Sequence, residues 1–518
     1  MVKIFIDEKP VEAEEETTIL NAATAAGIHI PHLCYHSYLP AEGSCRMCLV
    51  EIEGLPKLEL ACSTQVREGM KVFTQTDKVT QARKGVLEFL LAEHPIDCPI
   101  CDKAGECKLQ DYYEEYGLFE NQFEETKEKR DKKIPIGKKL LLDQERCILC
   151  TRCIRFLREV TKTQELGVFE RGIHSEINTY DGTLVDNNYS GNLAEICPVG
   201  AITDADFRFQ TRSWFLEQGE SICPLCSRGC SITIEYHKGF PRFPVPKKVY
   251  RIKARENPDI NGQWICDVGR YGYSHINEDR LSWIISNNHG NRKGLNWDNI
   301  SFLIAKRLLK FYHLHRTSWI AVLLNTWLTN EELFLLKKIF VEDLGVQKIF
   351  ILDPAEEDRD TLLLTPERSP NRRGVQEMGF SIESMDAEAI ANDTGLLLAF
   401  SPDLPSQWPT TEMKPVLGRI ETKILFTSHQ SDLCHDFDLV LPIALTAEKG
   451  GSLTNIEGKT QSFTRALDSP GESRPGWMIL VDLAEQLKIK FNHNKPFTSP
   501  EEIRKEMEQE ISFFRTKK

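Results

Sequence analysis

The chain has 518 residues, of which 41% are hydrophobic and 27% are charged, and its formal net charge is −13. This composition is that of a soluble globular protein, and the length predicts roughly three or four domains. An acidic chain has no global basic field, which argues against recruitment of nucleic acid or anionic lipid by charge. No apolar run approaches the ~18 residues needed to span a bilayer. The nearest candidate, residues 319–328, is short and contains Asn325.

Cysteine is concentrated in the first half of the chain, where 15 of the 16 cysteines precede residue 267. The first six residues alternate like a strand and lack a small-residue cleavage site behind them, so we expect a cytosolic chain. Disulfides are rare in that compartment. A long chain that gathers its thiols in one half is typical of a protein that carries metals.

Residues 1–78 are predicted to form a small β-rich domain. Strand-like patterns occur at residues 2–6, 49–52 and 71–73, and residues 19–26 have a short helical pattern. Four cysteines with the spacing C-x10-C-x2-C-x13-C lie on the loops: Cys34, Cys45, Cys48 and Cys62. Four thiolates can hold structural zinc, and they can equally hold a 2Fe–2S cluster.

The triplet Cys34-Tyr35-His36 resembles half of a Rieske site, in which two histidines replace two cysteines. The other half requires a histidine three residues after Cys45, and Cys48 occupies that position. The Rieske interpretation is therefore excluded. Three histidines of this stretch are then expected to pack or to form hydrogen bonds: His29, His32 and His36.

Residues 79–120 combine a helix with one imidazole and three thiols. An apolar stripe from Val79 to Leu91 predicts the helix, which Pro95 ends by pushing His94 out of the α region. A lone histidine there would more often cap the helix. Four candidate ligands follow one another in this stretch: His94, Cys98, Cys101 and Cys107. Imidazole and thiolates together select zinc or an iron–sulfur cluster. The mixed charge run at residues 124–133 is predicted to be a solvated linker.

Residues 138–216 carry three evenly stepped cysteines and a remote Cys-Pro pair: Cys147, Cys150, Cys153 and Cys197-Pro198. In two-cluster bacterial ferredoxins, the remote Cys-Pro completes the cluster of the first three. Leu157 replaces the fourth cysteine of the first run, and the remaining ligands of the second run fall at Asn187, Ser190 and Leu193. One of two ancestral clusters has therefore been lost, and the ligands of the other are complete.

Residues 217–275 supply another four-cysteine set: Cys223, Cys226, Cys230 and Cys266. Strand-like residues 231–236 and turns near Gly239 and Gly262 indicate a compact β-rich module. The local sequence leaves zinc open as the occupant of this set.

From residue 276 onward the pattern changes to alternating strands and helices with a single cysteine, Cys434. Buried strands are predicted at residues 319–325, 346–352, 395–400, 423–427 and 437–441, which favours a doubly wound α/β domain with a parallel sheet. Thr329 to Glu332 form a predicted capping box that opens a helix to Leu344. Residues 353–387 are predicted to be irregular, and residues 503–514 carry a helical stripe expected to pack in the core.

The order of these motifs resembles the large iron–sulfur subunits of bacterial respiratory complex I, the NADH:quinone oxidoreductase, and the resemblance covers the first 275 residues closely. The stretches that carry it are Pro31 to His36, Gly43 to Glu51, His94 to Asp111 and Arg146 to Cys153.

The resemblance implies a ligand set for each of four clusters. Cys34, Cys45, Cys48 and Cys62 would hold a 2Fe–2S cluster, and three further sets would each hold a 4Fe–4S cluster. Those sets are His94, Cys98, Cys101 and Cys107; Cys147, Cys150, Cys153 and Cys197; and Cys223, Cys226, Cys230 and Cys266. The last site is kept only by some bacterial members, in which it lies away from the main electron route.

The C-terminal half resembles the molybdopterin oxidoreductase fold that this family uses as a scaffold, through residues 437–442 and 448–458. Active relatives bind molybdenum through a Cys, selenocysteine or Ser after the last cluster motif. Cys434 is the only later cysteine and lacks that signature, so we expect a buried inert thiol and no molybdenum.

The implied fold is multidomain: a β-grasp-like 2Fe–2S ferredoxin domain (1–78), small α+β 4Fe–4S domains (79–120, 138–216 and 217–275) and a doubly wound molybdopterin-oxidoreductase-like domain (276–518). The implied function is electron relay within a membrane-associated translocase, from the NADH/FMN flavoprotein subunit toward quinone. Other peripheral-arm subunits would be partners, on the cytoplasmic side of a bacterial inner membrane.

No glycine-rich nucleotide-binding motif occurs in the sequence, so no hydride or quinone site is expected on this chain. Two alternatives from the same lineage stay open: an iron–sulfur subunit of an NAD-reducing hydrogenase, and a formate dehydrogenase. The alternative from another class is a zinc-stapled scaffold without a redox role.

Overall fold

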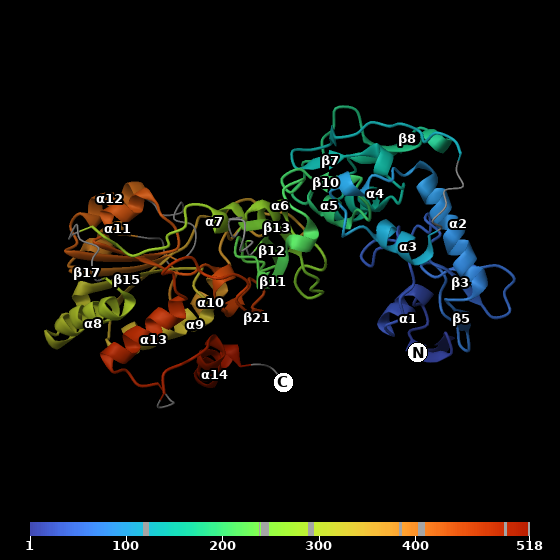
Figure 1. Ribbon diagram of the computed structural model, residues 1–518. Coiled ribbons are helices and arrows are strands. Elements are labelled where there is room, and N and C mark those ends of the chain that lie inside the picture. The colour runs from blue at the N-terminus through green and yellow to red at the C-terminus, as the bar shows by residue number, and fades with distance from the viewer. Residues whose placement is uncertain are drawn as a thin grey trace. The chain divides into compact units, whose positions relative to one another are not determined.

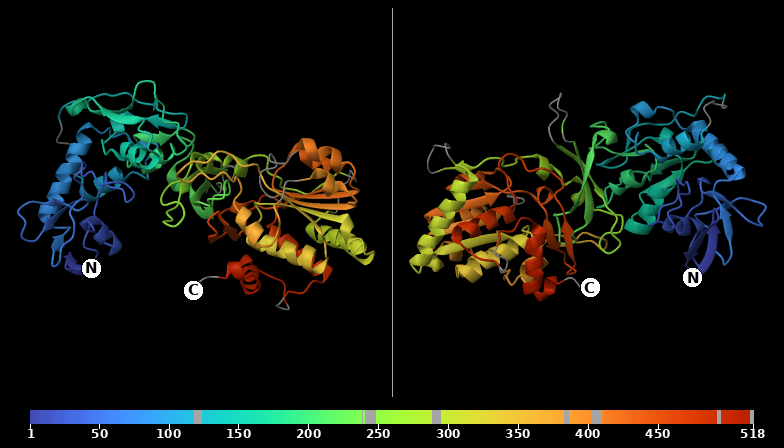
Figure 2. Two further views of the ribbon diagram at one scale, coloured as in Figure 1. Left: turned by 180° about the vertical axis from the view of Figure 1, so that it is seen from behind. Right: turned by 60° about the horizontal axis from the view of Figure 1, so that its bottom comes forward.

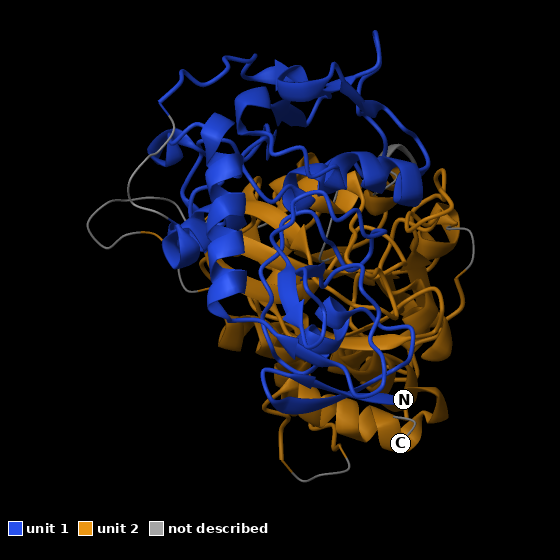
Figure 3. Ribbon diagram, turned by 90° about the vertical axis from the view of Figure 1, so that its right-hand side faces the viewer, with its two compact units in different colours: residues 1–216 blue, residues 217–518 orange. Residues whose placement is uncertain are grey.

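The computed structural model describes the chain except residues 118–123, 238, 240–247, 288–294, 383–385, 402–409, 492–494 and 516–518. Parts of the predicted domains 79–120, 217–275 and 276–518 therefore lie outside the described residues. The chain divides into two compact units, residues 1–216 and 217–518 (Figure 3). This division coincides with one of the predicted domain boundaries.

The first unit begins with a five-stranded sheet in the order β2-β1-β5-β3-β4. Its strands are β1 (Val2–Ile6), β2 (Lys9–Ala13), β3 (Leu49–Ile52), β4 (Glu59–Leu60) and β5 (Lys71–Phe73). β1 and β5 run parallel, and the other pairs are antiparallel. Alternate residues of β1 are buried, as the sequence predicted, and they pack with helix α1 (Ile19–Ala25).

The rest of the first unit consists of one long helix, α2, and shorter elements joined by loops (Figure 1). Its helices are α2 (Asp77–Glu93), α3 (Lys108–Tyr116), α4 (Arg152–Phe156) and α5 (Asn192–Ile196). Its strands are β6 (Ile134–Pro135), β7 (Leu140–Leu142) and β10 (Ile202–Asp204) in one sheet, and β8 (Leu166–Phe169) and β9 (Glu176–Thr179) in a pair. His94 caps α2 with φ −65° and ψ 129°, an extended conformation that confirms the predicted effect of Pro95.

The second unit begins with a three-stranded antiparallel sheet of β11 (Glu217–Ile222), β12 (Ser231–His237) and β13 (Lys248–Ala254). Two short helices follow, α6 (Asp267–Tyr271) and α7 (Ser274–Asn277).

A six-stranded sheet in the order β14-β19-β18-β17-β15-β16 forms the centre of the second unit. β15 (Ile320–Asn325), β16 (Lys348–Leu352), β17 (Leu396–Ser401), β18 (Thr422–Thr427) and β19 (Leu439–Pro442) are parallel, and β14 (Ile285–Ser286) is antiparallel to β19. A hairpin of β20 (Gly451–Thr454) and β21 (Thr460–Phe463) lies outside this sheet. The predicted parallel strands are present.

Both faces of the large sheet are covered, because successive residues of each strand point to opposite sides. Val322 and Leu324 of β15 join one apolar cluster, and Ala321 and Leu323 join another. The first cluster includes α8 (Trp297–His313), α9 (Asn330–Leu336), α13 (Gly476–Leu487) and α14 (Pro500–Glu510). The second includes α11 (Ala387–Ala391) and α12 (Thr410–Leu417), which Figures 1 and 2 show on the opposite side of the sheet from α8 and α13.

Several local predictions for the second unit are confirmed and one is wrong. The capping box is formed, since Thr329 Oγ1 accepts from Glu332 N at 3.2 Å and Thr329 N donates to Glu332 Oε2 at 2.9 Å. The helix continues past α9 as a π-helical stretch to Leu344. Residues 353–387 are not irregular throughout: α10 (Arg372–Glu377) forms there because Val375 joins the core. Ile503 and Met507 of the C-terminal stripe are core residues, as expected.

Among the described residues, the helices are too short or too polar to cross a lipid bilayer.

Candidate metal centres

The first cysteine set is brought together by loops of the N-terminal sheet. Cys34 follows α1, Cys45 and Cys48 precede β3, and Cys62 follows β4. The Cys34 amide donates to Cys45 Sγ at 3.3 Å. A hydrogen bond from the Cys45 thiol lowers the pKa of Cys34 to about 5, and one from Cys48 likewise lowers the pKa of Cys62. The four thiols therefore lie in two hydrogen-bonded pairs, Cys34 with Cys45 and Cys48 with Cys62.

His32 and His36 form hydrogen bonds, as predicted, and both are half-buried. His29 is exposed, and its ring lies 6.1 Å from that of Tyr112. His32 Nδ1 lies 2.9 Å from the Ile30 carbonyl oxygen, and His36 Nδ1 accepts from the Tyr38 amide at 3.3 Å. Burial lowers the pKa of both His32 and His36 to about 4, so both rings are neutral at physiological pH.

The second set lies between α2 and α3. Cys98 starts a 3₁₀ turn that Cys101 ends, and Cys107 stands at the N-cap position of α3. The pKa values of Cys101 and Cys107 are raised by burial, that of Cys107 to about 11. Cys98 and Cys107 each lie close enough to Cys101 for their charges to interact. The three thiols therefore lie near one another.

His94 presents a neutral imidazole near the same site. Burial lowers its pKa to about 4, and its ring is hydrogen-bonded to the backbone of Arg146. Its Nδ1 is buried and has no hydrogen-bond partner among the described residues. A buried nitrogen without a partner is costly, and coordination to a metal cluster would satisfy it. The residues present therefore fit a His/Cys3-ligated group.

Gly200 is a residue of this site that the sequence analysis missed. A Cβ atom built on it would overlap Cys101 Sγ. Gly200 follows Cys197 by three residues, so the segment that carries a ligand of the third set also leaves room for a ligand of the second. The only sequence signal was its proximity to the Cys-Pro pair.

An ion-pair network encloses the second set. Arg146 donates to both carboxylate oxygens of Asp97, from Nε at 3.1 Å and Nη2 at 2.7 Å, and Nη1 lies 3.1 Å from Asp143 Oδ2. Burial alone would raise the pKa of Asp97, but the hydrogen bond and charge of Arg146 lower it. This network holds the Cys98 loop against the segment that precedes Cys147.

The charge run at residues 124–133 is not simply a solvated linker. Lys127 Nζ donates to the carbonyl oxygens of Leu91 and His94, at 2.6 and 2.5 Å. Lys132 pairs with Glu145 at 2.5 Å. Lys127 thus satisfies carbonyl groups at the C-terminal end of α2 and holds this segment near His94. Composition alone did not show this role.

The third set surrounds a small cavity lined mainly by apolar residues and by its four cysteines. Cys147 and Cys150 lie on the loop into α4, where Leu149 and Thr151 have left-handed φ values of 50° and 58°. Cys153 lies in the first turn of α4, and Cys197 is the C-cap of α5. Burial raises the pKa of Cys147 to about 12 and that of Cys150 to about 11. The charges of neighbouring cysteines raise both of these pKa values further.

Apolar packing occupies part of the lost second ferredoxin site. Leu157 and Leu193, which stand in two of the vanished ligand positions, are both fully buried in the first unit. That this region keeps one complete ligand set and not two stays a prediction from the sequence.

The fourth set lies in the second unit, where β11 leads into Cys223 and α6 begins after Cys266. The Cys223 amide donates to the Cys230 carbonyl at 2.8 Å, and the Gly269 amide donates to Cys266 Sγ at 3.4 Å. A Cβ on Gly269 would lie 3.1 Å from Cys223 Sγ. Burial raises the pKa of Cys266 to about 12.

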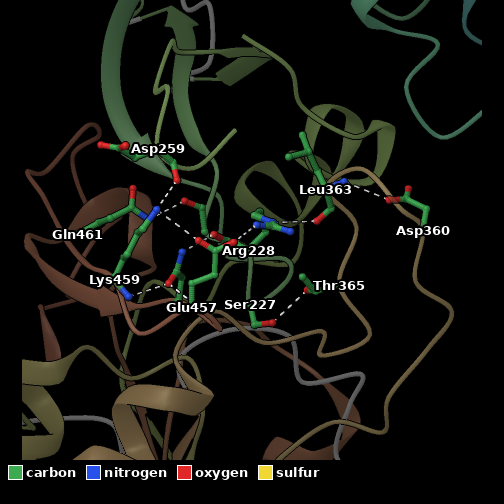
Figure 4. A network of polar contacts seen from close by, with 11 residues as sticks. Ser227, Arg228, Asp259, Asp360, Leu363, Thr365, Glu457, Lys459 and Gln461 are labelled. Carbon is green, nitrogen blue, oxygen red and sulfur yellow. Dashed lines mark hydrogen bonds and ion pairs between the residues drawn. The ribbon is translucent and has the colours of Figure 1, made fainter. Parts of the chain in front are cut away.

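A polar network ties the loop between Cys226 and Cys230 to the α/β scaffold (Figure 4). Ser227 Oγ donates to Thr365 Oγ1 at 3.0 Å, and Arg228 Nη1 donates to Glu457 Oε1 at 2.5 Å. Arg228 Nε also lies 3.4 Å from the Leu363 carbonyl oxygen. The fourth set is thus part of the second unit's own structure.

All 16 cysteines are among the described residues, and all are free thiols. No group of three or more His, Cys, Asp or Glu side chains among the described residues is arranged to hold a single metal ion. The assignment of individual ligands to clusters remains a prediction.

Four family models match successive parts of the chain. They are a 2Fe-2S iron-sulfur cluster binding domain (residues 1–77), the NADH-ubiquinone oxidoreductase-G iron-sulfur binding region (83–122), the ferredoxin-like domain of NADH-quinone oxidoreductase subunit 3 (137–203) and molybdopterin oxidoreductase (414–486). The chain is therefore multidomain, with 2Fe–2S, 4Fe–4S and molybdopterin-oxidoreductase-type domains in the predicted order.

Curated relatives carry matching names. The NADH-ubiquinone oxidoreductase 75 kDa subunit of Reclinomonas americana is 40% identical over 351 residues, 68% of this chain and 49% of the relative. NADH-quinone oxidoreductase subunit 3 of Thermus thermophilus is 37% identical over 344 residues, 60% of this chain and 43% of the relative. An NADH-quinone oxidoreductase subunit from Rickettsia bellii is 37% identical over 345 residues, 67% of this chain and 49% of the relative.

The chain is thus similar to large iron–sulfur subunits of NADH-quinone oxidoreductase. It spans about half the length of the large iron–sulfur subunits that it matches. A solved chain of an NAD+-reducing [NiFe]-hydrogenase in the H2-reduced state is 33% identical, with coverage of 41% of this chain and 91% of that chain. Its TM-score is 0.38, too low to establish a common fold.

Proposed function

We propose that this chain is the electron-transfer subunit of an NADH:quinone oxidoreductase. It relays electrons from an NADH- and FMN-binding flavoprotein subunit toward the quinone site. The observation that supports the proposal is that most of the fifteen thiols in the four predicted sets are buried, and that the first three sets fall within matched iron–sulfur domains. When bound, an iron–sulfur cluster supplies one-electron redox chemistry at each set. One such set alone would suit structural zinc, whereas four in one chain suit a relay.

The proposed ligands follow the predicted sets. Cys34, Cys45, Cys48 and Cys62 hold one 2Fe–2S cluster, and His94 with Cys98, Cys101 and Cys107 holds a 4Fe–4S cluster. Cys147, Cys150, Cys153 and Cys197 hold a second 4Fe–4S cluster, and Cys223, Cys226, Cys230 and Cys266 hold a third.

The protein's own contribution is to bury the ligands and direct backbone N–H groups at sulfur. The amides of Cys34, Leu149 and Gly269 lie 3.3 to 3.4 Å from ligand sulfurs. Such hydrogen bonds favour the thiolate form and make a cluster easier to reduce. His94 is neutral and replaces a thiolate, so its site is one charge unit less negative. This difference adjusts the reduction potential of that centre separately from the others.

The fold assignments that support this function are a β-grasp-like ferredoxin domain at residues 1–78, 4Fe–4S domains at 79–120, 138–216 and 217–275, and a doubly wound scaffold at 276–518. The scaffold is proposed to work without molybdenum. Cys434, its single cysteine, is buried in the apolar cluster beneath α12, an environment that suits packing and not metal binding.

The hydride step and quinone reduction are proposed to occur on other subunits. Partners are the flavoprotein subunit and other subunits of the peripheral arm of the complex. The proposed location is the cytoplasmic side of a bacterial inner membrane, with membrane contact made through those partners.

The relay is tested in the complex assembled with its partner subunits. Cys150→Ser removes a ligand of the third set, so NADH-driven quinone reduction should be lost. NADH oxidation by ferricyanide should persist, because the flavoprotein subunit performs the hydride step. Cys434→Ser, outside the four sets, is the control and should leave both activities unchanged. Undiminished quinone reduction by an assembled Cys150→Ser complex contradicts the relay, and hydrogen- or formate-driven NAD reduction favours the alternative lineages.

A further inference from the structure

Two buried arginines of α4 connect the first and third cysteine sets. Arg155 has 1% of its surface exposed. Its Nη2 donates to the carbonyl oxygen of Cys34 at 2.6 Å and to that of Cys150 at 3.1 Å. One nitrogen atom therefore bridges the backbone of a ligand of the first set and of a ligand of the third.

Arg152 makes a second connection between the same two sets. It has 5% of its surface exposed, and its Nη2 donates to the carbonyl oxygen of Tyr35, the residue after Cys34. Its Nη1 donates to the carbonyl oxygen of Ile196, the residue before Cys197, at 3.1 Å. The guanidinium thus joins the neighbours of two ligands that are far apart in the sequence.

The charges of the two arginines are poorly balanced by the protein. Both recorded acceptors of Arg152 are neutral carbonyl groups, and its Nε has no partner among the described residues. Among the described residues, Arg155 pairs with one carboxylate, Glu42 at 3.4 Å, and the Glu42 side chain is 41% exposed. A buried cation without a counter-charge is strongly unfavourable. Thiolate-ligated iron–sulfur clusters, which are anionic, would supply the missing negative charge on both sides.

We propose that Arg152 and Arg155 are shared counter-cations of two redox centres, those ligated by the Cys34 set and by the Cys147 set. This inference rests on the proposed function. A fixed positive charge between two anionic centres stabilises the more negative, reduced form of each. The two arginines therefore raise both reduction potentials together, and they hold the two ligand loops in register.

The test is an EPR-monitored redox titration of the full-length holoprotein, purified without oxygen. Arg152→Gln removes the charge but keeps a hydrogen-bond donor. At a fixed applied potential, the reduced-to-oxidised ratio of both centres should fall on the order of tenfold, a shift of about 59 mV for a one-electron couple. Arg152→Lys keeps the charge and should restore most of the ratio. Arg158→Gln is the control, since Arg158 follows α4 with a side chain that is 51% exposed and should shift neither centre.

Each outcome decides the proposal. Parallel downward shifts in Arg152→Gln with recovery in Arg152→Lys support it, and an unchanged potential at either centre overturns it. If Arg152→Gln loses its clusters, a loaded Arg152→Lys supports the proposal, and an equally empty one overturns it by showing that packing alone matters. A wild-type chain without any reducible iron–sulfur signal contradicts the proposed function itself.

Discussion

The two units are stabilised in different ways. In the first, segments far apart in the sequence are joined by buried arginines that donate to carboxylates and backbone carbonyls around the cysteine loops, as Arg146, Arg152 and Arg155 do. In the second, a parallel sheet is covered on both faces by large apolar clusters. We therefore expect the loops of the first unit to depend on what the cysteines bind, and the large sheet of the second unit, which is packed by apolar side chains, to be stable without metal.

Metal removal should produce the largest difference between the two units, because it should unfold the ligand loops of the first and spare the sheet of the second. We expect anaerobic chelation of the holoprotein to expose the ligand loops of residues 94–216, because buried cations there lose their counter-charges and thiols lose their cross-links. Amide protection in β15, β17 and β18 should persist. Hydrogen exchange with mass spectrometry measures both. Equal loss of protection in these strands and in the ligand loops would show that the scaffold also depends on metal.

A buried ion pair offers a way to weaken only the second unit. Lys449 Nζ contacts both carboxylate oxygens of Glu332, at 2.9 and 2.7 Å, and both side chains are 0% exposed. Lys449→Met leaves a buried carboxylate unpaired and should lower the free energy of unfolding by about 3–5 kcal/mol. Denaturant unfolding followed by circular dichroism measures the change.

Two further variants make this prediction specific. Adding Glu332→Gln to Lys449→Met should recover most of the loss, since glutamine retains the capping-box geometry and carries no charge. Lys306→Met, on the exposed face of α8, should have little effect. Weakened cluster signals of the first unit in Lys449→Met would contradict the separation of the two units.

Gly200→Ala tests the space around the second set within the first unit. The added Cβ overlaps Cys101 Sγ, so the ligand or its loop must move at a cost of about 1–3 kcal/mol. We expect an altered or lost EPR signal from the His94-ligated centre alone. Gly85→Ala is the matched control, because Gly85 lies within α2 with no atom near its Cβ position and should be neutral or slightly stabilising.

The smallest expected effect is a change in the pH dependence of stability, caused by a buried acid of the scaffold. Burial raises the pKa of Glu331 to about 7 from its ordinary 4.5. Between those pH values the folded state holds a proton that the unfolded state has released, so this group's contribution to stability falls as pH rises and is lost above about pH 7. Glu331→Gln should remove that dependence, whereas exposed Glu485→Gln should not. Thermal unfolding from pH 5 to 8 measures it, and parallel profiles for wild type and Glu331→Gln would refute the assignment.

Local patterns predicted much of the structure, and long-range contacts escaped prediction. Strand alternation at residues 2–6 and the Thr329–Glu332 capping box depend on neighbouring residues, so they could be read from the sequence. Cysteine spacing likewise predicted the four sets, whose assignment to clusters stays a prediction. The Arg155 bridge joins residues more than a hundred positions apart, and Gly200 matters only because Cys101 lies against it. Such roles follow from tertiary packing, which no local pattern encodes.

The central claim is that this chain holds four iron–sulfur centres, and the most direct test is its metal content. The full-length chain, purified anaerobically, should contain about 14 iron atoms, from one 2Fe–2S and three 4Fe–4S clusters, with a matching amount of acid-labile sulfide and EPR signals after dithionite reduction. A colourless chain with stoichiometric zinc and no reducible centre would contradict the account.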